Sequence, residues 1–195
     1  LARINRKSME ILPGDEVVKY VLLSNSHDGM MAARVGYSAV RVVCANTLAM
    51  AIEDKASKLM RVKHTKNIKE AIVSIRETMN LADAAFEATA EQYRRLVKYQ
   101  VVEADIKKYV QRVVATPAQE KELEDELASG VGERVWEQIK PLLETGMGAN
   151  IPGVRGTLWG AYNSVTEYLQ HYRGKEAGNR LESTWFKDGA ALNAK

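Results

Sequence analysis

The first 45 residues of the chain follow a β pattern. An apolar, β-branched run at Val17–Ser24 (VVKYVLLS) precedes a cluster of turn-forming residues that ends in Gly29. Glycine supplies the positive φ of a tight hairpin turn, so residues 30–35 are expected to return beside the first strand. A further turn over 36–38 and a third strand over 39–44 complete the antiparallel sheet that this pattern predicts.

Helical periods replace the β pattern beyond the sheet. Asn46 is a candidate N-cap for a helix over 47–52, and residues 59–63 are expected to form a short strand. A long helix is expected from Asn67 to Gln100, because its stripe residues recur at alternating steps of four and three. The stripe consists of Ile68, Ile72, Ile75, Met79, Ala82, Phe86, Thr89, Tyr93, Leu96 and Gln100. Such a stripe predicts either a helix laid across the sheet or an intermolecular coiled coil.

The rest of the chain is expected to be helical, with interruptions at glycines. Helices are expected over 105–114, from Pro117 onward, over 157–172 and over 178–193, with a break at Gly130 and Gly132 and a loop over 146–156. The predicted fold is therefore α+β: an N-terminal antiparallel sheet packed on a long helix, followed by a helical C-terminal part. Residues 1–114 and 115–195 are expected to be two parts of one domain.

Composition is that of a globular chain, with 46 % hydrophobic and 27 % charged residues among 195. No apolar run approaches the roughly 18 residues that a membrane-spanning helix needs, so we expect no membrane association. The single Cys44 excludes an internal disulfide and a multi-thiolate metal site, and it predicts a reducing, cytoplasmic location. Residues 1–114 hold 19 basic and 13 acidic side chains, whereas 115–195 hold 9 and 12. The first part is therefore better suited to bind an anion.

Residues 55–69 (KASKLMRVKHTKNIK) concentrate that positive charge. The stretch carries six Lys and Arg residues and no acid, although the net charge of the whole chain is only +3. Clustered cations among polar side chains suit phosphate binding, because each contact releases a condensed counterion. The structural alternative is a solvated connection between two elements. The candidate nucleic-acid-binding residues are Arg41, Lys55, Lys58, Arg61, Lys63, His64, Lys66, Asn67, Lys69 and Arg155.

Other residue types are weaker candidates for chemistry. The His27–Asp28 pair resembles that of metal phosphohydrolases but lacks the further ligands those sites need, and Cys44 is interpreted as a buried apolar residue. The glycine-rich segment 153–157 lacks the Gly-Lys-Ser/Thr of a phosphate-binding loop. Trp159, Tyr162, Tyr168 and Tyr172 could stack on bases. Trp159, Tyr162 and Tyr172 share helical spacing with Val165 and Leu169, and this spacing favours core packing. We therefore predict no catalytic residue, no metal and no cofactor. A metal-dependent nuclease resting on His27, Asp28 and His64 is the enzymatic alternative.

Several separated motifs resemble one known family. They are Ser24–Gly29 (SNSHDG), Arg41–Leu48 (RVVCANTL), Lys63–Asn67 (KHTKN), Gly156–Asn163 (GTLWGAYN) and Arg180–Phe186 (RLESTWF). In that order and spacing they resemble a family of phage- and plasmid-borne proteins, domain of unknown function 932. The resemblance implies mobile-element biology and further family sequence ahead of Leu1, and it brings no active site. A curled sheet followed by a long helix is also similar to the core of phage single-strand annealing proteins.

Together these features predict a non-enzymatic DNA-binding protein of phage or plasmid origin. It is expected to favour single strands, to promote annealing in recombination or replication, and to form a homo-oligomer. The alternative is a non-enzymatic interaction or inhibitory module, in which the basic stretch docks an acidic protein partner.

Overall fold

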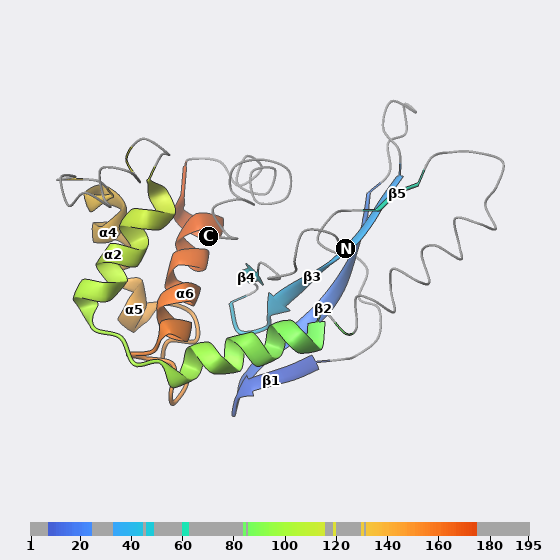
Figure 1. Ribbon diagram of the computed structural model, residues 1–195, viewed down its shortest axis with the longest axis horizontal. Coiled ribbons are helices and arrows are strands. Elements are labelled where there is room, and N and C mark those ends of the chain that lie inside the picture. Colours follow the sequence, from blue (N-terminus) through green and yellow to red (C-terminus); the bar gives the residue numbers. More distant parts are fainter. Residues whose placement is uncertain are drawn as a thin grey trace.

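The computed structural model describes residues 8–24, 33–44, 46–48, 60–62, 84, 86–115, 119, 130 and 132–174. The fold is α+β, as predicted. Figure 1 shows the sheet on one side and helices α2, α4, α5 and α6 on the other, with the helix of residues 86–98 beside β1.

The sheet is antiparallel throughout its described ladders. Its strands are β1 (Ser8–Leu12), β2 (Asp15–Ser24), β3 (Ala33–Arg41), β4 (Asn46–Leu48) and β5 (Met60–Val62). The order is β1-β2-β3-β4, and β5 also pairs with β3. Strand β4 pairs with residues 39–41 of β3 and β5 with residues 33–35. The two short strands therefore lie along one edge of β3, at its opposite ends.

Strand β3 corrects two of the predictions. The expected turn over 36–38 is wrong, because Gly36 pairs with Leu22 and Ser38 with Tyr20 in an uninterrupted ladder. The turn instead follows Arg41. The expected helix start at Asn46 is also wrong, because Asn46–Leu48 pairs with the end of β3. Pairing there satisfies the backbone groups of β3, and this tertiary requirement outweighs a local capping signal. Strand β1 was not predicted, whereas β2 and β5 were.

The helices largely follow the predicted pattern. They are the helix of residues 86–98, α2 (Glu103–Val114), α4 (Glu133–Ile139), α5 (Leu142–Thr145), α6 (Leu158–Glu167) and a π-helix, η1 (Tyr168–Tyr172). Gly132, with a φ of 72°, precedes α4 and confirms the predicted break. Thr157 caps α6 by accepting a hydrogen bond from Gly160 N. Most of the long helix before residue 86, the helix from Pro117 and the helix over 178–193 lie outside the described residues.

Two hydrophobic clusters form the core. The first joins α2, α4, α5, α6 and η1 through residues that include Val110, Ile139 and Val165. The second joins the sheet to the helix of residues 86–98 and to α6 through Ile11, Val17, Ala39, Phe86, Ala90, Tyr93, Val154 and Trp159. Within the described part of the predicted stripe, Phe86, Thr89 and Tyr93 are buried, and Phe86 and Tyr93 pack against the sheet of their own chain, as the first alternative predicted. The stripe does not extend to its predicted end, because the helix stops at residue 98 and Gln100 is exposed in a bridge to Thr157. None of the helices described is both long and apolar enough to cross a bilayer.

Candidate functional site

A buried polar cluster joins the sheet to the helical part of the chain. Arg41, at the end of β3, donates from Nε and Nη2 to the two carboxylate oxygens of Asp15, at 2.7 and 2.6 Å. Its Nη1 also donates to Met147 O at 3.2 Å, and Nη2 lies 3.4 Å from Gly148 O. Trp159 Nε1 donates to Asp15 Oδ2 at 2.8 Å. We call these five residues the Arg41 cluster; bidentate pairing and the tryptophan donor satisfy the buried carboxylate.

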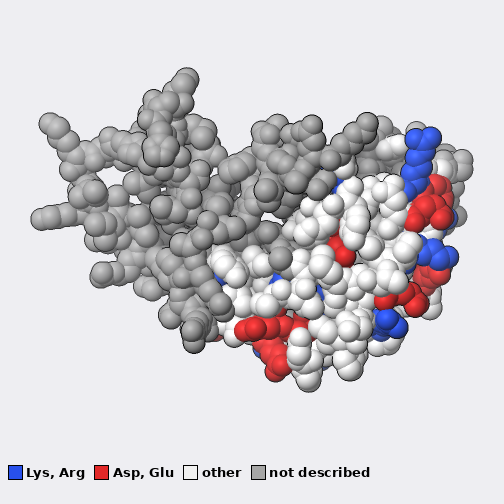
Figure 2. Space-filling model, turned by 180° about the vertical axis from the view of Figure 1, so that it is seen from behind, with Lys and Arg blue, Asp and Glu red and all other residues white. Residues whose placement is uncertain are grey.

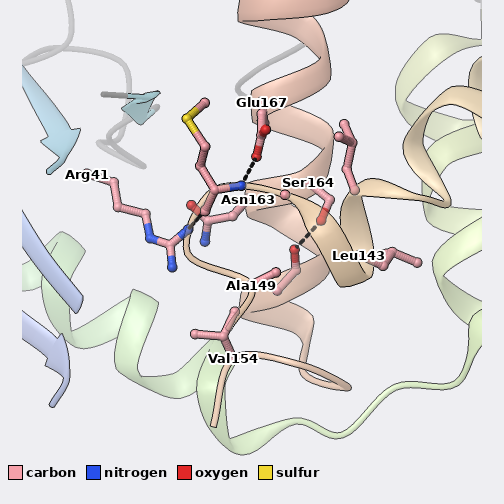
Figure 3. A pocket seen from close by; sticks show the side chains of 11 residues that line it. Arg41, Leu143, Ala149, Val154, Asn163, Ser164 and Glu167 are labelled. Atoms are coloured by element: carbon pink, nitrogen blue, oxygen red, sulfur yellow. Dashed lines mark hydrogen bonds between the residues drawn. The ribbon is translucent and has the colours of Figure 1, made fainter. Parts of the chain in front are cut away.

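Glu167 extends this cluster on the helical side. Its Oε2 accepts a hydrogen bond from Met147 N at 3.0 Å, so the backbone of Met147 connects a buried carboxylate to the Arg41 guanidinium (Figure 3). The cavity beside them is small: the centre of a water molecule could occupy a volume of only about 10 Å³ within it. That is about the room one water needs. The cavity therefore cannot hold a nucleotide or an organic cofactor, and its polar groups act as a structural joint.

Arg41 is consequently not available to an external phosphate. It was predicted to be one of the nucleic-acid-binding residues. Its side chain is instead 1 % exposed and bound to Asp15, which is itself fully buried. A buried carboxylate without a cation would carry a large desolvation penalty, so the fold uses the guanidinium internally.

Two arginines occupy directly opposite positions at the other end of β3. In the β3–β5 ladder the direct partner of Arg61 is Arg34, and the partner of Arg34 on its other side is Ser24. Directly opposite positions of an antiparallel pair share one face of the sheet, and like charges there are destabilising. Arg61 was predicted as a site residue. Arg34 was missed, because only the strand register reveals that the two cations are neighbours.

By register, positions 34 and 61 fall on the sheet face opposite to the one that carries Ala39. Val17 is the direct ladder partner of Arg41, and Ala39 lies two residues before Arg41 in β3, so all three share one face of the sheet. Val17 and Ala39 are buried against the helix of residues 86–98. Successive residues of a strand alternate between faces, so position 34 falls on the face opposite to position 39. We call this end of β3 and β5, defined by Arg34 and Arg61, the basic end of the sheet (Figure 1).

Most of the other predicted phosphate contacts lie outside the described residues. They are Lys55, Lys58, Lys63, His64, Lys66, Asn67 and Lys69. In the sequence, Lys63 directly follows β5 and Lys58 shortly precedes it. Arg155 is described: it is exposed in the loop before α6, and its Nη2 donates to Glu144 O at 2.8 Å. It lies in another part of the fold from β5 (Figure 1).

The family model for the domain of unknown function DUF932 matches residues 1–185. The chain belongs to this family. No curated protein and no solved structure matches it.

The helical part of this DUF932 protein carries charges of both signs. Lys107 Nζ lies 2.8 Å from Glu133 Oε1, and Lys140 Nζ lies 2.7 Å from Glu103 Oε1. The hydrogen bond that Lys140 donates to Glu103 is the main reason that the pKa of Lys140 is raised. On the face drawn in Figure 2, Lys and Arg alternate with Asp and Glu along one rim, and most of the described surface between is uncharged. These local pairs give the helical part little net attraction for a polyanion.

The aromatic residues separate into buried and exposed groups. Trp159 and Tyr168 are buried, and the burial of Trp159 confirms the core packing predicted for it. Tyr93 packs against Trp159 at a tilt of 37°, with ring centroids 5.0 Å apart. Burial, with a smaller effect of Tyr162, raises the pKa of Tyr93. Tyr172, at the end of η1, is exposed. Core packing therefore does not extend to the whole predicted set.

The structure describes only some of the residues that were weighed for enzymatic chemistry. Cys44 is buried, with Sγ 4.0 Å from Arg41 O, as the apolar interpretation predicted. No group of three or more His, Cys, Asp or Glu side chains gathers as a metal site within the described ranges. His27, Asp28 and His64 lie outside them, so the nuclease alternative stays an untested hypothesis.

Proposed function

We propose that this DUF932 protein is a non-enzymatic DNA-binding protein that uses the basic end of its sheet. It favours single strands and promotes their annealing during recombination or replication of a phage or plasmid. In this proposal it acts in the cytoplasm as a homo-oligomer. The observation that carries the proposal is the direct pairing of Arg34 with Arg61 across β3 and β5.

Like charges in directly opposite positions of a ladder are unfavourable, and Arg34 and Arg61 occupy such positions. A phosphate placed between them removes that repulsion and can accept charge-assisted hydrogen bonds from both guanidinium groups. The basic stretch of residues 55–69 passes through β5, so further cations flank Arg61 in the sequence on both sides. A run of phosphates matches such a run of cations better than a single small anion does.

The preference for single strands rests on architecture. A sheet with a helix packed across one face is similar to the core of phage single-strand annealing proteins, and this analogy agrees with the mobile-element setting of the resemblance. Analogy of fold alone does not fix a function. The strand preference is therefore the part of the proposal that most needs a direct test.

The test is equilibrium binding of the full chain to labelled single- and double-stranded oligonucleotides across a salt series. We expect tighter binding to single strands, with an affinity that falls as salt rises. The variant K63E/K66E/K69E should weaken binding strongly. A matched change of three charges in the helical part, K108E/R112E/R134E, should weaken it much less, because all three residues are exposed there. Absence of binding at low salt, or equal losses in both variants, would contradict the proposal.

An acidic protein partner is the second candidate function. Arginine recognises carboxylates as well as phosphates, so the Arg34–Arg61 pair suits an acidic docking peptide equally in its local chemistry. A pull-down from host extract separates the two candidates. Recovery of one stoichiometric protein that persists after nuclease treatment, together with no oligonucleotide binding, would favour the interaction module.

A further inference from the structure

We propose that Tyr99 is a stacking platform for an unpaired base, with Arg95, Lys98 and Arg155 as flanking cations. This inference rests on the proposed function and adds a second contact to it. It assigns a role to a residue that the sequence pattern did not select.

Tyr99 is exposed where the other large aromatic residues near it are not. Its exposed fraction is 61 %, compared with 4 % for Tyr93 and 0 % for Trp159. Val102, three residues further on, is 63 % exposed. This turn therefore presents an aromatic ring and an aliphatic side chain to solvent, directly beside a helix whose other face is buried.

The backbone that carries Tyr99 is fastened on both sides. Leu158 N donates to Tyr99 O at 2.9 Å, and Val101 N donates to Gly156 O at 2.9 Å. Gln100 and Thr157 form an antiparallel bridge between these bonds. Because the turn is already ordered, binding a base there costs little additional backbone entropy. An ordered backbone beneath the ring favours a stacking platform.

Charge complementarity indicates the kind of ligand. Arg95 and Lys98 are exposed in the last turn of the helix, directly before Tyr99. They are three residues apart, so they are neighbours on the helix surface. The exposed Arg155 directly precedes the pairing of Gly156 with Val101. Glu103, the next acid after Tyr99, is paired with Lys140. An aromatic ring among cations fits a base with its adjacent phosphates, which is how proteins bind single strands without sequence preference.

The test uses the full chain and an oligodeoxythymidylate that contains one 2-aminopurine, whose fluorescence reports stacking directly. Binding of the unaltered chain should change that fluorescence. Tyr99→Ala should abolish most of the change and weaken binding about 5- to 150-fold, the range for loss of one base–aromatic stack. Tyr99→Phe should retain both. Tyr172→Ala, which removes another exposed tyrosine, is the matched control and should behave like the unaltered chain.

The outcomes separate this inference from the proposed function. Unchanged affinity and fluorescence in Tyr99→Ala, with binding still lost in K63E/K66E/K69E, would overturn the platform and leave the proposed function standing. Equal losses in the Tyr99→Ala and Tyr172→Ala variants would also overturn it, because any exposed ring would then serve. Failure of the unaltered chain to bind would overturn both.

Discussion

The guanidinium group of Arg41 donates to both carboxylate oxygens of Asp15, and neither side chain is more than 1 % exposed. This pair fixes the end of β3 to the start of β2. Through the carbonyls of Met147 and Gly148 it also holds the loop before α6 against the sheet. The same residue that looked suited to bind a phosphate therefore determines how the two parts of the fold meet.

Removing one member of this buried pair should be strongly destabilising. We expect Arg41→Leu to lower the free energy of unfolding by about 3–5 kcal/mol, because Asp15 would remain buried without a cation. Urea denaturation measures the change. Lys107→Ala, which breaks the exposed pair with Glu133, should cost about 0–1 kcal/mol. A loss for Arg41→Leu no larger than that of the control would contradict this role.

The indole of Trp159 should contribute through its hydrogen bond as well as its volume. Trp159→Phe removes the donor to Asp15 Oδ2, and a hydrogen bond to a charged group is worth about 1.5–3 kcal/mol. The control is Trp136→Phe, which makes the same substitution at a buried tryptophan of the first hydrophobic cluster. We expect the Trp159 variant to lose more stability than the Trp136 variant by about that amount in urea denaturation. Equal losses would show that packing alone accounts for Trp159.

Gly148 should not tolerate a side chain. Its φ is +79°, and a Cβ placed there would lie 2.7 Å from Val43 Cγ1 and 2.9 Å from Arg41 Nη2. Gly14 has a similar φ of +82°, but a Cβ introduced there would meet nothing within 4 Å. Both Gly→Ala variants carry the backbone penalty of about 1–2 kcal/mol, and only Gly148→Ala also disturbs the Arg41 cluster. Gly148→Ala should therefore lower the thermal midpoint clearly further; matching midpoints would count against the cluster's tight packing.

Stability should decline in alkaline solution partly because of Tyr93. Burial raises its pKa well above the ordinary value of 10.0. Below pH 10 the phenol is protonated in both the folded and the unfolded chain, so its full contribution to stability is present. As the pH rises further, the unfolded chain ionises while the folded chain keeps the proton, and stability is lost up to the folded pKa. Tyr93→Phe should flatten the pH dependence of unfolding above pH 10, measured by urea denaturation at several pH values; an unchanged slope would exclude this cause.

Local patterns predicted much of the fold. The β-branched run predicted β2, the glycines located the starts of α4 and α6, and the apolar stripe predicted a helix packed on the sheet. They failed where partners distant in sequence decide the outcome. Gly36 and Ser38 read as a turn, yet a complete ladder with β2 keeps them in β3. Asn46 read as a helix cap, yet the end of β3 recruits it into β4.

The candidate site was harder to predict for the same physical reason. Charge density identified Arg61 and the stretch around it, but the pairing of Arg61 with Arg34 depends on a register that sequence spacing does not reveal. Arg41 failed as a phosphate contact because its partner, Asp15, lies in another strand. Exposure of Tyr99 likewise follows from how the chain turns between residues 98 and 102.

The most direct test of the central claim is the salt dependence of single-strand binding by the variant R34Q/R61Q. Neutralising two phosphate contacts should reduce the magnitude of the slope of log K against log salt by about 1.4, at roughly 0.7 per contact on single strands. Because the two residues are like charges in opposite positions, the variant should be no less stable than the unaltered chain. The account predicts weaker binding with this flatter slope in a folded protein. An unchanged slope and affinity would contradict it.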